Sequence, residues 1–117
     1  MSDLTFSIDQ ATHAPGTPPS LVLRLVGSVS IDDAAQLERA VAQVLGQAPL
    51  RVVVDISKLS FISSVGMAAL VKLHRGLKHR GGEVRLVGPS PPVFGVLDRA
   101  RLIELMPIAP SVESALL

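Results

Sequence analysis

Three consecutive valines stand near the middle of the chain, within the run Arg51–Ile56. β-Branched side chains favour strands, and an unbroken apolar run of this kind is typical of a strand that is buried on both faces. Such strands occur in parallel sheets that carry helices on their faces. The chain has 117 residues, which suits one domain with a real core, so we expect residues 1–117 to form a single layered domain.

The segments before this run predict two further strands. Apolar and polar residues alternate over residues 4–8, which is the period of a half-buried strand. The segment Asp9–Ser20 is rich in proline and indicates a loop, and Leu21–Val26 is apolar except for one arginine. We expect these two strands to pair in antiparallel orientation, with Gly27 ending the second.

A helix is predicted between the second strand and the valine run. Ser30 is followed three residues later by Asp33, which is the arrangement of an N-terminal capping box. Gly46 and Pro49 mark the end of this helix. The residues between them include one apolar stripe at helical spacing, formed by Ala34, Leu37, Val41, Val44 and Leu45.

The second half of the chain continues this alternation of strands and helices. Ser63 and Ser64 begin a predicted helix that runs to about Arg80, and a strand follows at Glu83–Val87. The inner positions expected for the helix are Met67, Leu70, Val71, Leu73 and Leu77.

The last part of the chain predicts one more helix, a short strand and a final turn. Pro91 and Pro92 suit the start of the helix, because proline is favoured in a first helical turn. We expect the short strand at Met106–Ile108, and Ser111 is expected to cap the final turn. The apolar stripe of the helix consists of Val93, Val96, Leu97 and Ala100.

This order of elements predicts an α/β fold. Strand–helix–strand units make the centre of a sheet parallel through right-handed crossovers, and the opening pair supplies an antiparallel edge. We therefore expect a mixed, mainly parallel sheet of four to five strands packed with about four α-helices.

The segment Ser63–Gly66 is the place where chemistry is most plausible. It lies between a predicted strand and a predicted helix, where backbone N–H groups lack partners. A serine here can accept one of those N–H groups and simply cap the helix. It can also be phosphorylated, since a phosphate at this point meets the positive end of the helix. Gly66 either lets another chain approach closely or serves tight packing.

A resemblance to a known family adds weight to the second interpretation. Val52–Ile56, followed by Leu59–Met67, resembles the central signature of STAS-domain anti-sigma factor antagonists. The resemblance continues through Gly81, Gly82 and Leu97–Leu102 to the end of the chain. It implies a STAS fold, in which the serine two residues before the signature glycine accepts the phosphate.

That acceptor position falls on Ser64 of this sequence. Relatives often carry aspartate one residue earlier, where this chain has Ser63, so Ser63 is a rival acceptor. We predict that Asp55 sits at the carboxyl edge of the sheet beside Ser64. Relatives also tend to be acidic just after the second strand, whereas here Asp32 comes slightly later. The partner-binding residues predicted on this basis are Ser63, Ser64, Val65, Gly66, Met67, Asp55 and Asp32.

The resemblance also implies a set of partners. The unphosphorylated protein is expected to bind an anti-sigma factor that is also a serine kinase of the GHKL type, which releases a sigma factor. Phosphorylation by that kinase ends the binding, and a PP2C-type phosphatase restores it. A monomer acting in the cytoplasm is expected. The alternative is a STAS-domain docking subunit of a membrane transport complex, in which the same face binds constitutively.

Composition and charge argue against several other functions. The formal charge is only +1 and the chain has no Tyr or Trp, so we expect no direct binding of nucleic acid. It has no cysteine, and its histidines accompany no convergent carboxylates, so no metal or other cofactor is expected. No catalytic constellation is present, which predicts a binding module and not an enzyme. No apolar run is long enough for membrane insertion.

Overall fold

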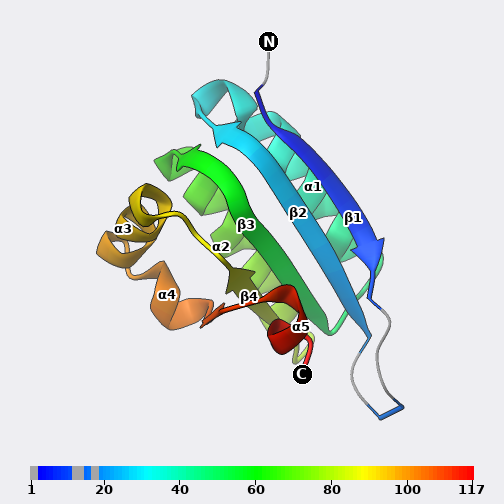
Figure 1. Cartoon of the computed structure of the whole chain (residues 1–117). Coiled ribbons are helices and arrows are strands. Elements are labelled where there is room, and N and C mark those ends of the chain that lie inside the picture. Colours follow the sequence, from blue (N-terminus) through cyan, green and yellow to red (C-terminus); the bar gives the residue numbers. More distant parts are fainter. Residues whose placement is uncertain (1–2, 12–14, 17–18) are drawn as a thin grey trace.

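The computed structural model describes residues 3–11, 15–16 and 19–117, and it contains one five-stranded sheet in the order β1-β2-β3-β4-β5 (Figure 1). β1 and β2 are antiparallel, and all other neighbours are parallel. The fold is therefore the mixed, mainly parallel α/β fold that the sequence predicts. The strands are β1 (Thr5–Gln10), β2 (Ser20–Val29), β3 (Arg51–Ile62), β4 (Glu83–Val87) and β5 (Ile108–Ala109).

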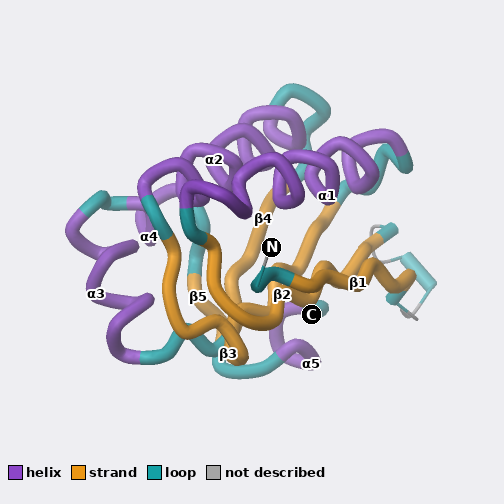
Figure 2. Tube along the Cα trace, turned by 90° about the horizontal axis from the view of Figure 1, so that it is seen from above, coloured by secondary structure: helices purple, strands orange, loops and turns teal. Residues whose placement is uncertain are grey.

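Helices cover both faces of this sheet. α1 and α2 lie side by side on one face, and α5 lies against the other, as Figure 2 shows. α3 packs against β3 and α4 packs against α3, and both helices contribute to the larger core cluster. The helical elements are the 3₁₀ turn η1 (Ile31–Asp33), α1 (Ala34–Gly46), α2 (Ser64–Lys78), α3 (Pro91–Arg99), α4 (Leu102–Leu105) and α5 (Val112–Ala115).

The valine run forms the centre of the core, as predicted. Val52 and Val54 belong to the large cluster under α1 and α2, whereas Val53 belongs to the smaller cluster under α5. All three side chains are fully buried. Alternate residues of a strand point to opposite faces, so a run of valines can fill both layers at once.

Two local predictions are confirmed in atomic detail. The Asp33 carboxylate accepts hydrogen bonds from the backbone N–H and the hydroxyl of Ser30, at 2.9 Å and 2.7 Å, which forms the expected capping box. Ser111 accepts a hydrogen bond from the Ser114 N–H at 3.1 Å and caps α5.

The second and third strands are longer than predicted, because both continue through a bulge. Gly27 does not end β2: its φ of +107° lies in the region that favours glycine, and the strand runs on to Val29. The register between β2 and β3 shifts between Arg24 and Val26 and again between Gly27 and Ser28, after which pairing continues to Val29 and Ile62. Because pairing continues beyond the bulge, the polar segment of β3 after Ile56 remains part of the sheet.

Other boundaries differ at the C-terminal side. α4 was not predicted; it follows Arg101, whose left-handed φ of +59° turns the chain directly after α3. Ala100 is exposed and does not join the α3 stripe, and α2 ends at Lys78, since the glycine pair stops it earlier than Arg80. β5 is shifted to Ile108–Ala109, because Met106 is fully buried in the core.

The predicted loop Asp9–Ser20 is shorter than expected where the structure describes it. Asp9 and Gln10 complete β1, and Ser20 begins β2. Residues 12–14 and 17–18 of that loop lie outside the described part of the chain.

Candidate functional site

The start of α2 is built around the side chain of Ser63. This residue has extended backbone angles and is the N-cap, and its Oγ accepts a hydrogen bond from the Gly66 N–H at 3.2 Å. Its own N–H donates to the Val29 carbonyl at 2.8 Å, which ties the helix start to the end of β2. Ser63 is only 9 % exposed. The capping role that the sequence left open therefore falls on Ser63.

Ser64 occupies a very different position one residue later. It is the first residue of α2 and is exposed to solvent. Within the described part of the chain its side chain has no hydrogen-bond partner. Its hydroxyl is thus free at the positive end of a helix, where a negative group is stabilised by the unpaired N–H groups.

Gly66 serves tight packing inside the chain. A Cβ atom at this position would lie 2.7 Å from Val29 Cγ1 and 2.9 Å from Ile62 Cγ1, well inside van der Waals contact. The first turn of α2 therefore sits directly on the ends of β2 and β3. Of the two interpretations of this glycine, the geometry favours packing, because Gly66 is buried against Val29 and Ile62.

Exposed apolar side chains lie on the elements that meet near Ser64, and of these the sequence indicated only Val65. Ile31 of η1 is 74 % exposed, Phe61 of β3 49 %, and Val65 of α2 39 %. The three elements meet at one end of the sheet, since Val29 pairs with Ile62 and η1 contacts α2. Large exposed apolar side chains on neighbouring elements are typical of a protein-binding surface. We call Ile31, Phe61 and Val65 the apolar patch. Sequence patterns do not reveal such a patch, because single apolar residues near strand ends are usually buried.

The other predicted partner-binding residues divide between this surface and the core. Asp32 is exposed in η1, next to Ile31, so it can contribute to the same face. Met67 is half-buried and packs against the large core cluster. Only its exposed part can reach a partner.

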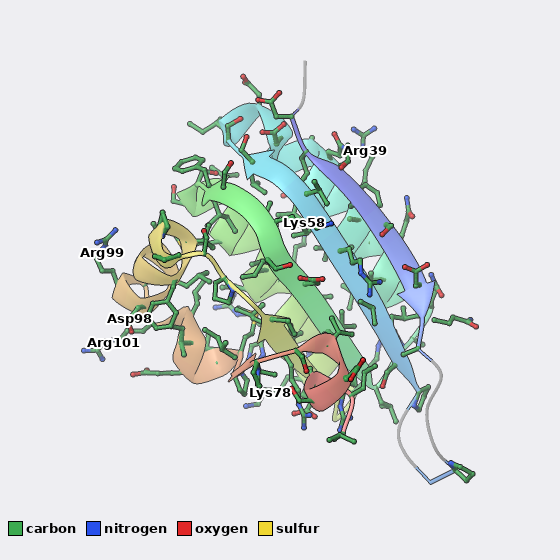
Figure 3. All side chains as sticks on the ribbon, in the orientation of Figure 1. Arg39, Lys58, Lys78, Asp98, Arg99 and Arg101 are labelled. Atoms are coloured by element: carbon green, nitrogen blue, oxygen red, sulfur yellow. The ribbon has the colours of Figure 1, made fainter. Side chains whose placement is uncertain are left out.

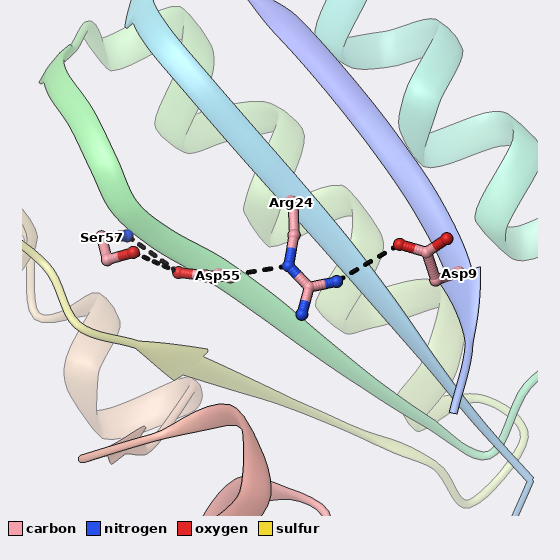
Figure 4. A network of polar contacts seen from close by, with 4 residues as sticks. All are labelled: Asp9, Arg24, Asp55 and Ser57. Carbon is pink, nitrogen blue, oxygen red and sulfur yellow. Dashed lines mark hydrogen bonds and ion pairs between the residues drawn. The ribbon is translucent and has the colours of Figure 1, made fainter. Parts of the chain in front are cut away.

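The predicted position of Asp55 beside Ser64 is wrong. β3 does not end there but continues for seven more residues to Ile62, which is about 20 Å at the usual rise per residue. Asp55 instead belongs to a polar network on the sheet face opposite α1 and α2, shown in Figure 4. Its Oδ2 lies 3.7 Å from Nε of Arg24, which also reaches Oδ2 of Asp9 at 3.2 Å. Its Oδ1 accepts the N–H and hydroxyl of Ser57, at 3.0 Å and 2.7 Å.

Two features are absent from the described residues. Among them, no three His, Asp or Glu side chains gather as a metal would require. None of the helices in the described ranges is both long enough and apolar enough to cross a membrane.

Comparisons with known proteins place this geometry in a family. The STAS domain family matches residues 10–115 of the chain. BtrV of Bordetella bronchiseptica, whose name assigns it provisionally as an anti-sigma factor antagonist, is 32 % identical over 95 residues. That match covers 81 % of this chain and 82 % of BtrV.

Solved structures share the fold at lower sequence identity. The anti-sigma factor antagonist SpoIIAA in its unphosphorylated form superposes with a TM-score of 0.76, at 24 % identity over 94 % of this chain and 92 % of that one. The phosphorylated form of the Bacillus protein gives 0.69, at 23 % identity over 94 % and 96 %. A sulfate transporter family protein of Wolinella succinogenes gives 0.68, at 22 % identity over 81 % and 80 %. On the family match and the BtrV similarity, both of which span most of its length, this chain belongs to the STAS-domain family of anti-sigma factor antagonists.

Proposed function

We propose that this chain is a partner-switching anti-sigma factor antagonist in which Ser64 is the switch. The unphosphorylated form binds an anti-sigma factor that is also a GHKL-type serine kinase, and this binding releases a sigma factor. The kinase phosphorylates Ser64 and ends the binding, and a PP2C-type phosphatase reverses the modification. The chain acts as a monomer in the cytoplasm and has no catalytic activity of its own.

The single observation that carries this proposal is the contrast between the two serines. A kinase must reach a hydroxyl and place it in line with the γ-phosphate of ATP. Ser64 is exposed and unpaired, whereas the Ser63 hydroxyl is nearly buried and holds the Gly66 N–H. This contrast supports Ser64 over Ser63 as the acceptor.

The surroundings of Ser64 explain how a phosphate can act there. It adds about −1.5 to −2 charges at neutral pH. The helix start stabilises that charge, so the fold is retained, but the charge lies among the exposed side chains of Ile31, Phe61 and Val65. A partner that packs on this apolar patch would have to desolvate the phosphate. A loss of about 2.7 kcal/mol would weaken binding about 100-fold.

Similarity to both forms of SpoIIAA supports a switch without refolding. The phosphorylated and unphosphorylated structures each resemble this chain over 94 % of its length. A surface event at a helix start is compatible with one fold for both states.

A docking subunit of a membrane transport complex is the second candidate. The sulfate transporter family protein has a similar fold, which supports this candidate. The sequence similarity, however, lies with anti-sigma factor antagonists. In a docking subunit the apolar patch around Ser64 would bind constitutively, and Ser64 would carry no phosphate.

Site mapping after a kinase reaction tests the proposal. The wild type, Ser64→Ala and Ser63→Ala are each incubated with ATP and the cognate serine kinase, and intact mass is measured before peptide mapping. We expect one phosphate on the wild type, none on Ser64→Ala, and one on the matched control Ser63→Ala. Modification of Ser64→Ala at the wild-type rate would overturn the assignment.

A further inference from the structure

The second half of α2 carries a concentration of positive charge that the proposed switch does not use. Lys72, Arg75, Lys78 and His79 are all exposed, and the residues of α2 include no aspartate or glutamate. The whole chain is close to neutral, with a formal charge of +1, so this helix departs from the average. We define these four residues as the basic face.

The four side chains lie on one side of the helix. At 3.6 residues per turn, positions 72, 75, 78 and 79 fall within about 120° of its circumference. A shallow hollow of about 310 Å³ opens between Arg75, Lys78 and His79.

The basic face is not neutralised within the described part of the chain. The ion pairs there involve Arg24, Arg51 and Arg85, and none of them reaches α2. Arg80, just after the helix, donates to the Leu45 carbonyl and not to a carboxylate.

The positive charge of the basic face also affects His74, on the same helix. Burial, and then the charges of Lys78 and Arg75, lower the pKa of His74. Its Nδ1 is buried and has no hydrogen-bond partner.

Stabilisation of the helix dipole accounts for only part of this arrangement. Cations are favoured in the last helical turn, where Arg75 and Lys78 lie, and the effect fades before it. Lys72 lies earlier, and like charges three or four residues apart repel each other on a helix. No carboxylate of the described chain offsets this repulsion. A negatively charged group on a partner would offset it, so such a group is expected to bind here.

We propose that the basic face of α2 is a docking surface for an acidic segment of a partner protein. One helix face with three long cations matches the width of a single peptide segment, whereas a DNA duplex calls for a broader basic surface. The face also presents no large apolar side chain that could enter a bilayer, as a membrane-binding helix requires. The proposal stands whether or not Ser64 is a switch.

Docking here is expected to be independent of the charge at Ser64. Lys72 follows Ser64 by eight residues, which is about 12 Å along the helix. The Debye length at physiological ionic strength is about 8 Å, so exposed charges at that separation are largely screened. A partner could thus stay anchored at one end of α2 while the other end is released.

A titration with a defined acidic probe tests this surface. The probe is an end-capped peptide of about ten glutamates, and binding is followed by amide chemical shifts at physiological ionic strength. The test variant is the triple change Lys72→Gln, Arg75→Gln and Lys78→Gln, which keeps good helix formers and preserves the fold. The matched control is Arg39→Gln, Lys58→Gln and Arg99→Gln, three cations far from α2's basic end in Figure 3 and outside any described ion pair.

We expect shifts centred on the basic face, a loss of affinity of about tenfold or more in the test variant, and a change within about twofold in the control and in Ser64→Asp. Equal binding by the test and control variants would overturn the proposal. Tighter binding to vesicles containing phosphatidylserine, or to a DNA duplex, than to the peptide would also overturn it. Peptide binding to the basic face is measured separately from the effect of Ser64→Asp. The titration therefore tests the basic face even if Ser64 proves not to be the switch.

Discussion

Ser63 and Ser64 are adjacent in sequence, yet their hydroxyls lie in opposite environments. Ser63 Oγ is nearly buried, 3.2 Å from the Gly66 nitrogen, and closes the first turn of α2. Ser64 begins the helix with its side chain in solvent. Ser63 therefore stabilises the start of the helix, whereas Ser64 offers its hydroxyl to a partner. Mutating each serine alone can separate these two roles.

The stability of the fold should depend on Ser63 and hardly on Ser64. Ser63→Ala removes the N-cap and should lower the free energy of unfolding by about 0.5–2 kcal/mol. Ser64→Ala removes no hydrogen bond within the described chain and should change it by about 0.5 kcal/mol or less. Urea denaturation measures both. Ser63→Asp is the control, because aspartate also caps helices; a large loss of stability there would contradict the capping role.

Replacing Gly66 by alanine should destabilise the protein through overpacking. The new Cβ must displace Val29 and Ile62, which costs about 1–3 kcal/mol. Gly95→Ala in α3 is the matched control, since a Cβ there meets nothing and alanine favours helix. Thermal unfolding should show a lower midpoint for Gly66→Ala and an unchanged or higher one for Gly95→Ala. Equal midpoints would mean that the helix start is not tightly packed.

Asp55 should have no part in kinase binding. It lies about 20 Å along β3 from the start of α2, within the network of Arg24 and Ser57. Asp55→Asn should therefore leave the affinity for the anti-sigma kinase within about twofold, whereas Phe61→Ala in the apolar patch should weaken it by about tenfold or more. Calorimetric titration of the kinase with each variant measures both affinities. A strong effect of Asp55→Asn would place the kinase interface on the sheet face opposite α1 and α2.

Stability should fall as the solution becomes mildly acidic, and His74 should be one cause. Burial and the charges of Lys78 and Arg75 lower the pKa of His74 below its ordinary value of 6.5. Below pH 6.5, His74 therefore binds a proton more readily in the unfolded chain than in the folded one. The contribution of His74 to the free energy of unfolding is complete above pH 6.5 and is lost as the pH falls toward the folded pKa. Urea midpoints at pH 7.5 and 5.5 should differ less in His74→Gln than in the wild type.

The periodicity of the sequence predicts the layers of this fold, but it does not predict the bulge in β2. The valine run and the Ser30–Asp33 box carry local signals that the structure reproduces. The continuation of β3 past Asp55 depends on pairing with β2 across Gly27, a long-range relationship that no local pattern contains. The misplacement of Asp55 follows directly from that bulge.

The candidate site shows the same division. The Ser63–Gly66 signature could be located from sequence, because helix starts and phosphoacceptor motifs are local. The apolar patch could not, because the exposure of Phe61 depends on which elements leave it uncovered. Nor does the sequence alone distinguish the buried serine from the free one.

Charge at the two serines should have unequal effects on the partner. Ser64→Asp should weaken binding of the anti-sigma kinase, and Ser63→Asp should do so less, since an aspartate at position 63 can cap the helix in place of the serine. An aspartate carries only about one charge, so mimicry of the phosphate is partial.

The most direct measurement is a calorimetric titration of the anti-sigma kinase with the unmodified protein and with protein phosphorylated at Ser64 alone, at fixed salt. The proposed switch predicts an affinity about 100-fold lower for the phosphorylated protein, with unchanged unfolding midpoints. Equal affinities for the two forms would contradict it.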